Sequence, residues 1–274
     1  MNGFCSNVRF PLSSTTTAGV LFIALTFGLV GCVSSSSIVN QGLSSASEAA
    51  GEQIGKAIGA EIARSANLPP AGSAQYNQFM VSQAQVMFSY AFSAGGMWPA
   101  QAQFESGEWA TYQLRSADGG TALDTLERAF LKTTDEGHEW WRIRGVHDGE
   151  AWVYEALLDT TRQEVVRLRT KDPEGKVGEV PVTEKTLYSP PQRLTQESIE
   201  GATTETEQVN TPAGTFAARR VEYTGAGQGG TVTWFMSEEV PGHVVRYQAS
   251  RSGSRYTSDL LGYGSDATTQ LESY

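Results

Sequence analysis

The sequence has almost no cysteine: two residues, Cys5 and Cys32, in a chain of 274. Cys5 lies in an N-terminal segment that we expect to be removed, which would leave Cys32 alone. A single thiol cannot form a disulfide within its own chain. A disulfide framework and a cysteine-rich metal site are therefore both excluded.

The sequence also lacks a hydrophobic run long enough to cross a membrane. Its most apolar N-terminal stretch, residues 18–30, has 13 residues, whereas a spanning helix needs about 20. That length matches the apolar region of a signal peptide, about 7–15 residues. Arg9 precedes the stretch and no acidic residue does. We therefore expect residues 1–31 to be an export signal.

Four residues at the end of this segment, Leu29-Val30-Gly31-Cys32, resemble the lipobox of bacterial lipoproteins. The resemblance implies that Cys32 is lipidated and becomes the mature N-terminus. The residue after Cys32 is Val33 and not Asp, which resembles bacterial lipoproteins that are sent to the outer membrane. Residues 32–41 then form a polar tether, and the protein is expected in the cell envelope. The alternative is an ordinary secretory signal with a chance cysteine.

Positive charge is scarce, and the formal net charge is −10. Nucleic acids and anionic membrane surfaces attract basic patches, so neither is an expected partner. Charged residues make up only 18% of the chain, while aromatic residues make up 10%. Such a composition excludes a disordered chain and favours an exported protein rich in β structure.

Residues 42–94 are predicted to form a helical hairpin. Helix 42–65 is separated from helix 73–94 by Leu68-Pro69-Pro70-Ala71-Gly72, which cannot continue a helix. Ser73 is a suitable N-cap for the second helix. The first helix carries Gly51, Gly55 and Gly59 on one face, which allows close packing. The hairpin is either a structural element or a surface for self-association or membrane contact.

Residues 104–274 are predicted to form antiparallel β structure with roughly nine to eleven strands in a meander. Turn dipeptides Asp118-Gly119 and Asp148-Gly149, and glycine turns at residues 135–137 and 173–175, separate segments of alternating polarity. Residues 181–202 contain paired prolines and are expected to be an irregular or short helical crossover. The fold class is α+β, a helical hairpin followed by a large curved antiparallel sheet.

No catalytic motif is present. His138, His147 and His243 have no metal-ligand spacing, and no nucleophile motif or phosphate-binding loop occurs. We expect neither a metal nor another cofactor, and no enzyme activity. A hydrolase with carboxylates distant in sequence remains the open alternative.

Residues 209–247 combine a Thr-Pro-Ala-Gly-Thr-Phe turn, a tryptophan strand and a Val-Pro-Gly turn. This segment resembles the half-barrel class of bacterial lipoprotein carriers (LolA/LolB-like). The resemblance implies a curved sheet around an apolar groove that receives lipid. The expected function is thus binding of a lipid or another apolar ligand by a membrane-anchored lipoprotein. The alternative is a scaffold in an envelope protein assembly. Candidate ligand-binding residues are Trp140, Trp141, Trp152 and Trp234.

Adjacent Trp140 and Trp141 cannot face the same side of a regular strand, because successive side chains alternate. We predict that one indole packs in a core between sheet and helix. The other is predicted to border an apolar cavity.

Replacement of Cys32 by Ala should leave the protein uncleaved or soluble, because no acyl chain can then be attached. Stable anchoring needs more than one acyl chain, each buried methylene contributing about 0.8 kcal/mol. Membrane fractionation and the mass of the mature N-terminus measure the effect. Normal cleavage and membrane retention of Cys32→Ala would refute lipidation.

Overall fold

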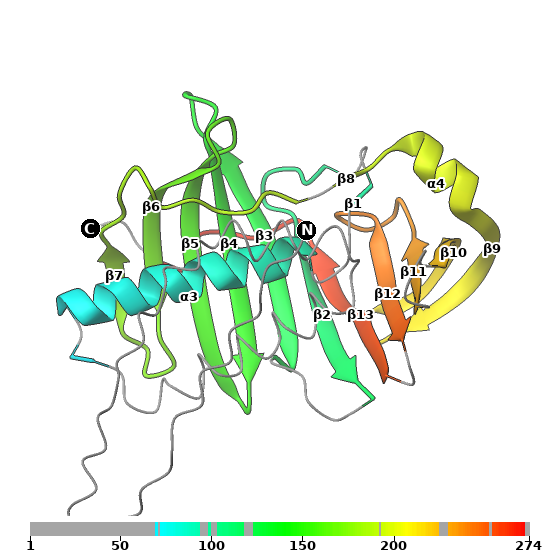
Figure 1. Ribbon diagram of the computed structural model, residues 1–274, viewed down its shortest axis with the longest axis horizontal. Helices are drawn as coiled ribbons and strands as arrows, with labels where there is room; N and C mark the ends of the chain where they lie inside the picture. Colours follow the sequence, from blue (N-terminus) through cyan, green and yellow to red (C-terminus); the bar gives the residue numbers. More distant parts are fainter. Residues whose placement is uncertain are drawn as a thin grey trace, which may run out of the picture. The chain divides into compact units, whose positions relative to one another are not determined.

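The computed structural model describes residues 69–70, 72–93, 98–99, 103–117, 123–191, 193–224, 230–251 and 254–271. Figure 1 shows a large sheet with helices packed against it. Cys32, the tether and predicted helix 42–65 with its glycine stripe lie outside the described residues. The strands are β1 (Trp98–Pro99), β2 (Trp109–Ser116), β3 (Thr125–Thr133), β4 (Glu139–His147), β5 (Glu150–Asp159), β6 (Glu164–Lys171), β7 (Val177–Val180), β8 (Arg193–Leu194), β9 (Thr203–Thr211), β10 (Gly214–Thr224), β11 (Gly230–Met236), β12 (Val244–Arg251) and β13 (Ser254–Gly264).

Eleven of these strands form one sheet in the order β7-β6-β5-β4-β3-β2-β13-β12-β11-β10-β9, and every pairing in it is antiparallel. The predicted strand number and antiparallel class are confirmed. The prediction of a single meander is wrong. Two meanders, β2 to β7 and β9 to β13, are joined where the last strand returns to pair with β2. β1 and β8 form a separate parallel pair.

The turns predicted from the sequence contain residues with positive φ, in the left-handed region of backbone conformation. Asp148 and Gly149 connect β4 to β5 with φ values of 50° and 81°, as in the tight hairpin turns that Asp-Gly favours. Gly137 and Gly175 also have positive φ, at 83° and 85°. These turn predictions are confirmed, whereas Asp118-Gly119 lies outside the described residues.

The predicted second helix is α3 (Ala74–Ser93), and Ser73 fixes its start. The Ser73 hydroxyl accepts the backbone N–H of Tyr76 at 3.1 Å, which satisfies one free donor of the first turn. The predicted N-cap is therefore confirmed. Neither α3 nor the other described helix is long and apolar enough to cross a bilayer.

α3 lies across one face of the sheet, called here the α3 face, and contacts β3, β4 and β7 (Figure 1). Gly145 of β4 permits a close approach, because a Cβ there would lie 2.5 Å from Met87 Cε. The side chains of α3 buried in the shared core are Tyr76, Met80, Ala84, Met87, Phe88, Tyr90, Ala91 and Phe92.

Polar contacts fix α3 at both ends. The Tyr76 hydroxyl donates to Asp172 Oδ2 at 3.3 Å. Burial, and next the Asp172 carboxylate, raise the pKa of Tyr76 to about 12. At the other end, buried Arg128 donates from Nη1 to the Ala91 carbonyl at 3.0 Å. A cation is favoured there because carbonyls are free in the last turn of a helix.

α4 (Gln196–Ala202) covers a second apolar cluster, on β10 to β12. Thr195 caps this helix by accepting the backbone N–H of Ser198 at 3.2 Å. Ile199 is the buried residue of α4, and it packs in the cluster that contains Trp234. The predicted crossover at residues 181–202 is confirmed, with its helical turn at the end.

Replacement of Phe88 by Ala should destabilise the protein by about 3–5 kcal/mol, because it opens a cavity between α3 and the sheet. Exposed Gln78 on the same helix is the matched control, and Gln78→Ala should change stability by no more than about 0.5 kcal/mol. Urea denaturation followed by circular dichroism measures both. Equal effects of the two substitutions would show that α3 is not packed on the sheet.

Candidate functional site

Trp140 and Trp141 face opposite sides of β4, as predicted. Trp141 lies on the α3 face, where its ring is 5.4 Å from Phe92 of α3, measured between centroids. Phe104 and Phe130 lie 5.3 and 5.1 Å from it. Trp141 is thus the indole in the core between sheet and helix.

Trp140 lies on the opposite face, in surroundings different from those predicted. The Arg169 guanidinium lies 4.5 Å from its ring centroid, and that of Arg167 lies 5.8 Å away. A cation over an indole face is attracted by the ring electrons. Trp140 is therefore covered by arginine, and the prediction that it borders an apolar cavity is wrong in the described structure.

The other two candidate tryptophans are also buried. Trp152 packs against Phe79 of α3, with ring centroids 6.3 Å apart. Trp234 lies in the α4-covered cluster, 5.4 Å from the Tyr247 ring. The four tryptophans do not line one surface. Three belong to apolar cores, and Trp140 belongs to a charged layer.

The histidines are separated. His147 meets Asp124 and Asp148, with potential ligand atoms all within 4.8 Å of one another. Both aspartates are exposed, and Asp124 Oδ2 already accepts the backbone N–H of Asp148 at 2.8 Å. This group closes the turn between β4 and β5. Burial lowers the pKa of His243, which lies in the turn before β12.

His138 lines a polar pocket of about 590 Å³ beside the turn between β5 and β6. Its Nε2 lies 3.7 Å from Asp159 Oδ2. The backbone N–H of Arg162 is the main cause of a lowered pKa at Asp159. The pocket is lined by Glu136, Gly137, His138, Asp159, Thr161, Arg162, Glu164, Val165, Val166, Val182, Thr183 and Glu184.

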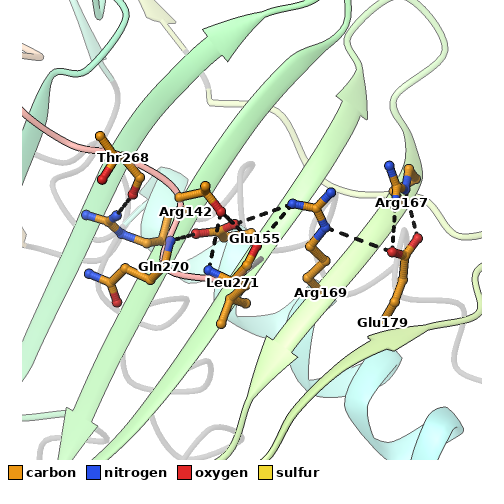
Figure 2. Close-up of polar contacts among 9 residues, drawn as sticks. Arg142, Glu155, Arg167, Arg169, Glu179, Thr268, Gln270 and Leu271 are labelled. Carbon is orange, nitrogen blue, oxygen red and sulfur yellow. Dashed lines mark hydrogen bonds and ion pairs between the residues drawn. The ribbon is translucent and has the colours of Figure 1, made fainter. Parts of the chain in front are cut away.

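Strands β4 to β7 carry a row of paired charged side chains that was not predicted from the sequence. Arg142 of β4 is paired in register with Glu155 of β5, Glu155 with Arg169 of β6, and Arg169 with Glu179 of β7. Opposite charges thus alternate across four strands (Figure 2). We call these four residues the charge ladder. Their sequence neighbours, such as Tyr154, lie in the α3 core, so the ladder occupies the opposite face.

The middle of the ladder is buried. Glu155 has an exposed fraction of 0%, and Arg142 and Arg169 have 5% and 6%. Arg169 Nη1 lies 4.0 Å from Glu155 Oε2. At the outer end, Glu179 receives two hydrogen bonds from Arg167, at 2.8 and 2.6 Å. Arg167, as the largest cause, lowers the pKa of Glu179.

Residues 265–271, called here the strap, bury this ladder by crossing its face after β13 ends. Glu155 accepts two hydrogen bonds from the strap, from Thr269 Oγ1 and from the backbone N–H of Gln270, each at 2.6 Å. The two arginines donate to strap carbonyls, Arg142 to Thr268 and Arg169 to Leu271 (Figure 2).

Two contacts hold the beginning of the strap. Trp109 Nε1 donates to Asp266 Oδ1 at 2.8 Å, and the Ala267 N–H donates to the Gly107 carbonyl at 2.8 Å. A Cβ on Gly107 would lie 2.7 Å from the Ser265 carbonyl oxygen. This position therefore needs glycine both for the close approach and for its φ of 90°.

A weak sequence signal for the ladder exists. Glu155 is a lone charge in the otherwise uncharged segment AWVYEALL, and Arg142 directly follows two tryptophans. Buried charges are normally paired. The pairing of the ladder charges, however, is set by the register of the strands. The strap that covers Glu155 lies more than 110 residues away in the sequence.

No protein-family model matches the sequence, and no curated protein is similar to it in sequence. Among solved structures, MucB is 10% identical with a TM-score of 0.39, covering 70% of this chain. This chain spans 63% of the MucB chain. The hypothetical protein CT021 from Chlamydia trachomatis is 10% identical with a TM-score of 0.33, covering 62% of this chain and 92% of that chain. At this level of similarity, neither protein indicates a role for any residue of this chain or an activity for the chain.

Replacement of Glu155 by Gln should destabilise the protein by about 3–5 kcal/mol, because it removes the buried carboxylate that pairs with Arg169 and accepts two hydrogen bonds from the strap. The matched control is Glu179→Gln at the outer end of the ladder, where the side chain is 33% exposed. An exposed pair contributes about 1 kcal/mol or less. Urea denaturation at pH 7 compares the two, and a loss at Glu155 no larger than that at Glu179 would contradict the ladder.

Proposed function

We propose that this chain is a lipid-anchored protein of the bacterial cell envelope that binds a protein partner as a scaffold and is not an enzyme. The export signal and the Leu29-Val30-Gly31-Cys32 motif support the anchor. The net charge of −10 disfavours nucleic acid and anionic lipid as partners. The carrier-like segment at residues 209–247 supports an envelope role.

The filled α3 face is the observation that carries the scaffold proposal. Met80, Phe88 and Ala91 of α3 have exposed fractions of 0–1%. In the described residues, the face that a carrier would offer to an acyl chain holds the protein's own side chains. A protein with a filled core interacts through its surface.

Strand β9 is the surface element best suited to such an interaction. It lies at the end of the sheet in the described structure and is nine residues long. A terminal strand has backbone donors and acceptors on its outer side that can pair with another chain.

Apolar ligand binding remains the second candidate. A large antiparallel sheet with a helix over its apolar face is the arrangement expected of the lipoprotein-carrier class. α3 carries the flexible residues Met80 and Met87 against the sheet, and methionine adapts readily to new neighbours. In this version a ligand enters by displacing α3.

Site-specific photo-crosslinking tests the scaffold. A photoreactive residue in place of exposed Thr206 or Gln208 on β9 should give a discrete adduct of defined mass in intact cells, because the partner pairs there. Exposed Glu174, in the turn between β6 and β7, is the control position and should give none.

A fluorescent fatty acid separates the two candidates. The folded, purified protein should show no saturable binding, because the α3 face is filled. Saturable binding that is abolished in Trp141→Asp while the fold is retained, together with no adduct from β9, would replace the scaffold with the carrier.

A further inference from the structure

The strap is bound to the sheet much as a peptide ligand is bound to a receptor. It adds no strand, since β13 ends at Gly264. Ser265, Asp266, Thr268, Thr269 and Gln270 remain exposed. The strap nevertheless ends on Leu271, whose exposed fraction is 0%.

Most of the recognition is directed at the strap backbone. Arg142 and Arg169 bind carbonyl groups, and Glu155 binds the N–H of Gln270. Two side chains add selectivity, the Thr269 hydroxyl on Glu155 and the buried Leu271. The site thus fits a segment with a threonine two residues before a leucine.

The strap is also placed where exchange is possible. It follows the last strand, so its release breaks no pairing of the sheet. Its departure leaves Glu155 between Arg142 and Arg169 without its two donors from the strap. A vacated ladder therefore presents the same donors and acceptors, held in place by strand register, to another segment of the same kind.

We propose that the ladder face is an interface for a second copy of this chain, which binds by inserting its strap in place of the resident one. A second copy is the occupant that the structure supports, because the fit of this segment to the site is seen directly. Such exchange of an identical element is a known route to dimers. The inference deepens the scaffold proposal by naming one partner, but it does not depend on β9.

Complementation between two full-length variants in detergent tests the proposal. The first carries Thr269→Val and Leu271→Ala, which weaken its strap and spare its ladder. The second carries Glu155→Gln, which weakens its ladder and spares its strap. A tagged copy of the first should retain the second in a 1:1 complex, whereas neither should pair with itself. The control adds the two strap substitutions to the second variant and should abolish retention.

A labelled synthetic peptide of residues 264–274 is a second probe, which does not require the Glu155→Gln chain to fold. It should bind the strap-weakened variant at least tenfold more tightly than the wild-type chain, whose own strap competes. It should also raise the Tm of that variant with peptide concentration, as ligands of the native state do. A peptide with the same two substitutions should do neither.

Equal behaviour of the two peptides on the strap-weakened variant, with no retention in the complementation, would overturn the proposal. The strap would then be a purely intramolecular closure. That result would leave the crosslinking test on β9 unaffected, so the failure of exchange and the failure of the scaffold are distinguishable.

Discussion

A sheet presents alternate side chains to two faces, so a sheet of eleven strands must be covered or charged on both. Here the two faces are stabilised by different interactions, apolar burial on one and paired charges on the other. On the α3 face, two helices bury apolar side chains. On the opposite face, between β4 and β7, opposite charges alternate in register, and the strap removes the middle of that row from water. The arrangement of charge ladder and strap depends on Glu155, which contacts both.

Features set by local sequence were predictable, and features set by distant pairing were not. The cap at Ser73, the Asp148-Gly149 turn and the opposite orientations of Trp140 and Trp141 each depend on neighbours within a few residues. The antiparallel class followed from the same turns. The pairing of β2 with β13 joins segments about 150 residues apart, and no local pattern reports it.

The error at Trp140 has the same origin. Alternation within β4 correctly placed one indole on each face, but it does not show what lies above an indole. Arg169 reaches Trp140 from β6, two strands away in the sheet. Candidate binding residues inferred from aromatic content are therefore distributed between cores and a charged layer, because burial of a large ring is first a requirement of folding.

The position of β13 ties both halves of the sheet to the C-terminal end of the chain. β13 pairs with β12 on one side and with β2 on the other, so it joins the two meanders. The strap that follows it covers the ladder formed by strands of the first meander. Contacts between segments so distant in sequence form late in folding, because closing a long loop costs entropy before the contact stabilises it. The cover of the first meander therefore depends on a segment more than 110 residues away in the sequence from the carboxylate that it covers.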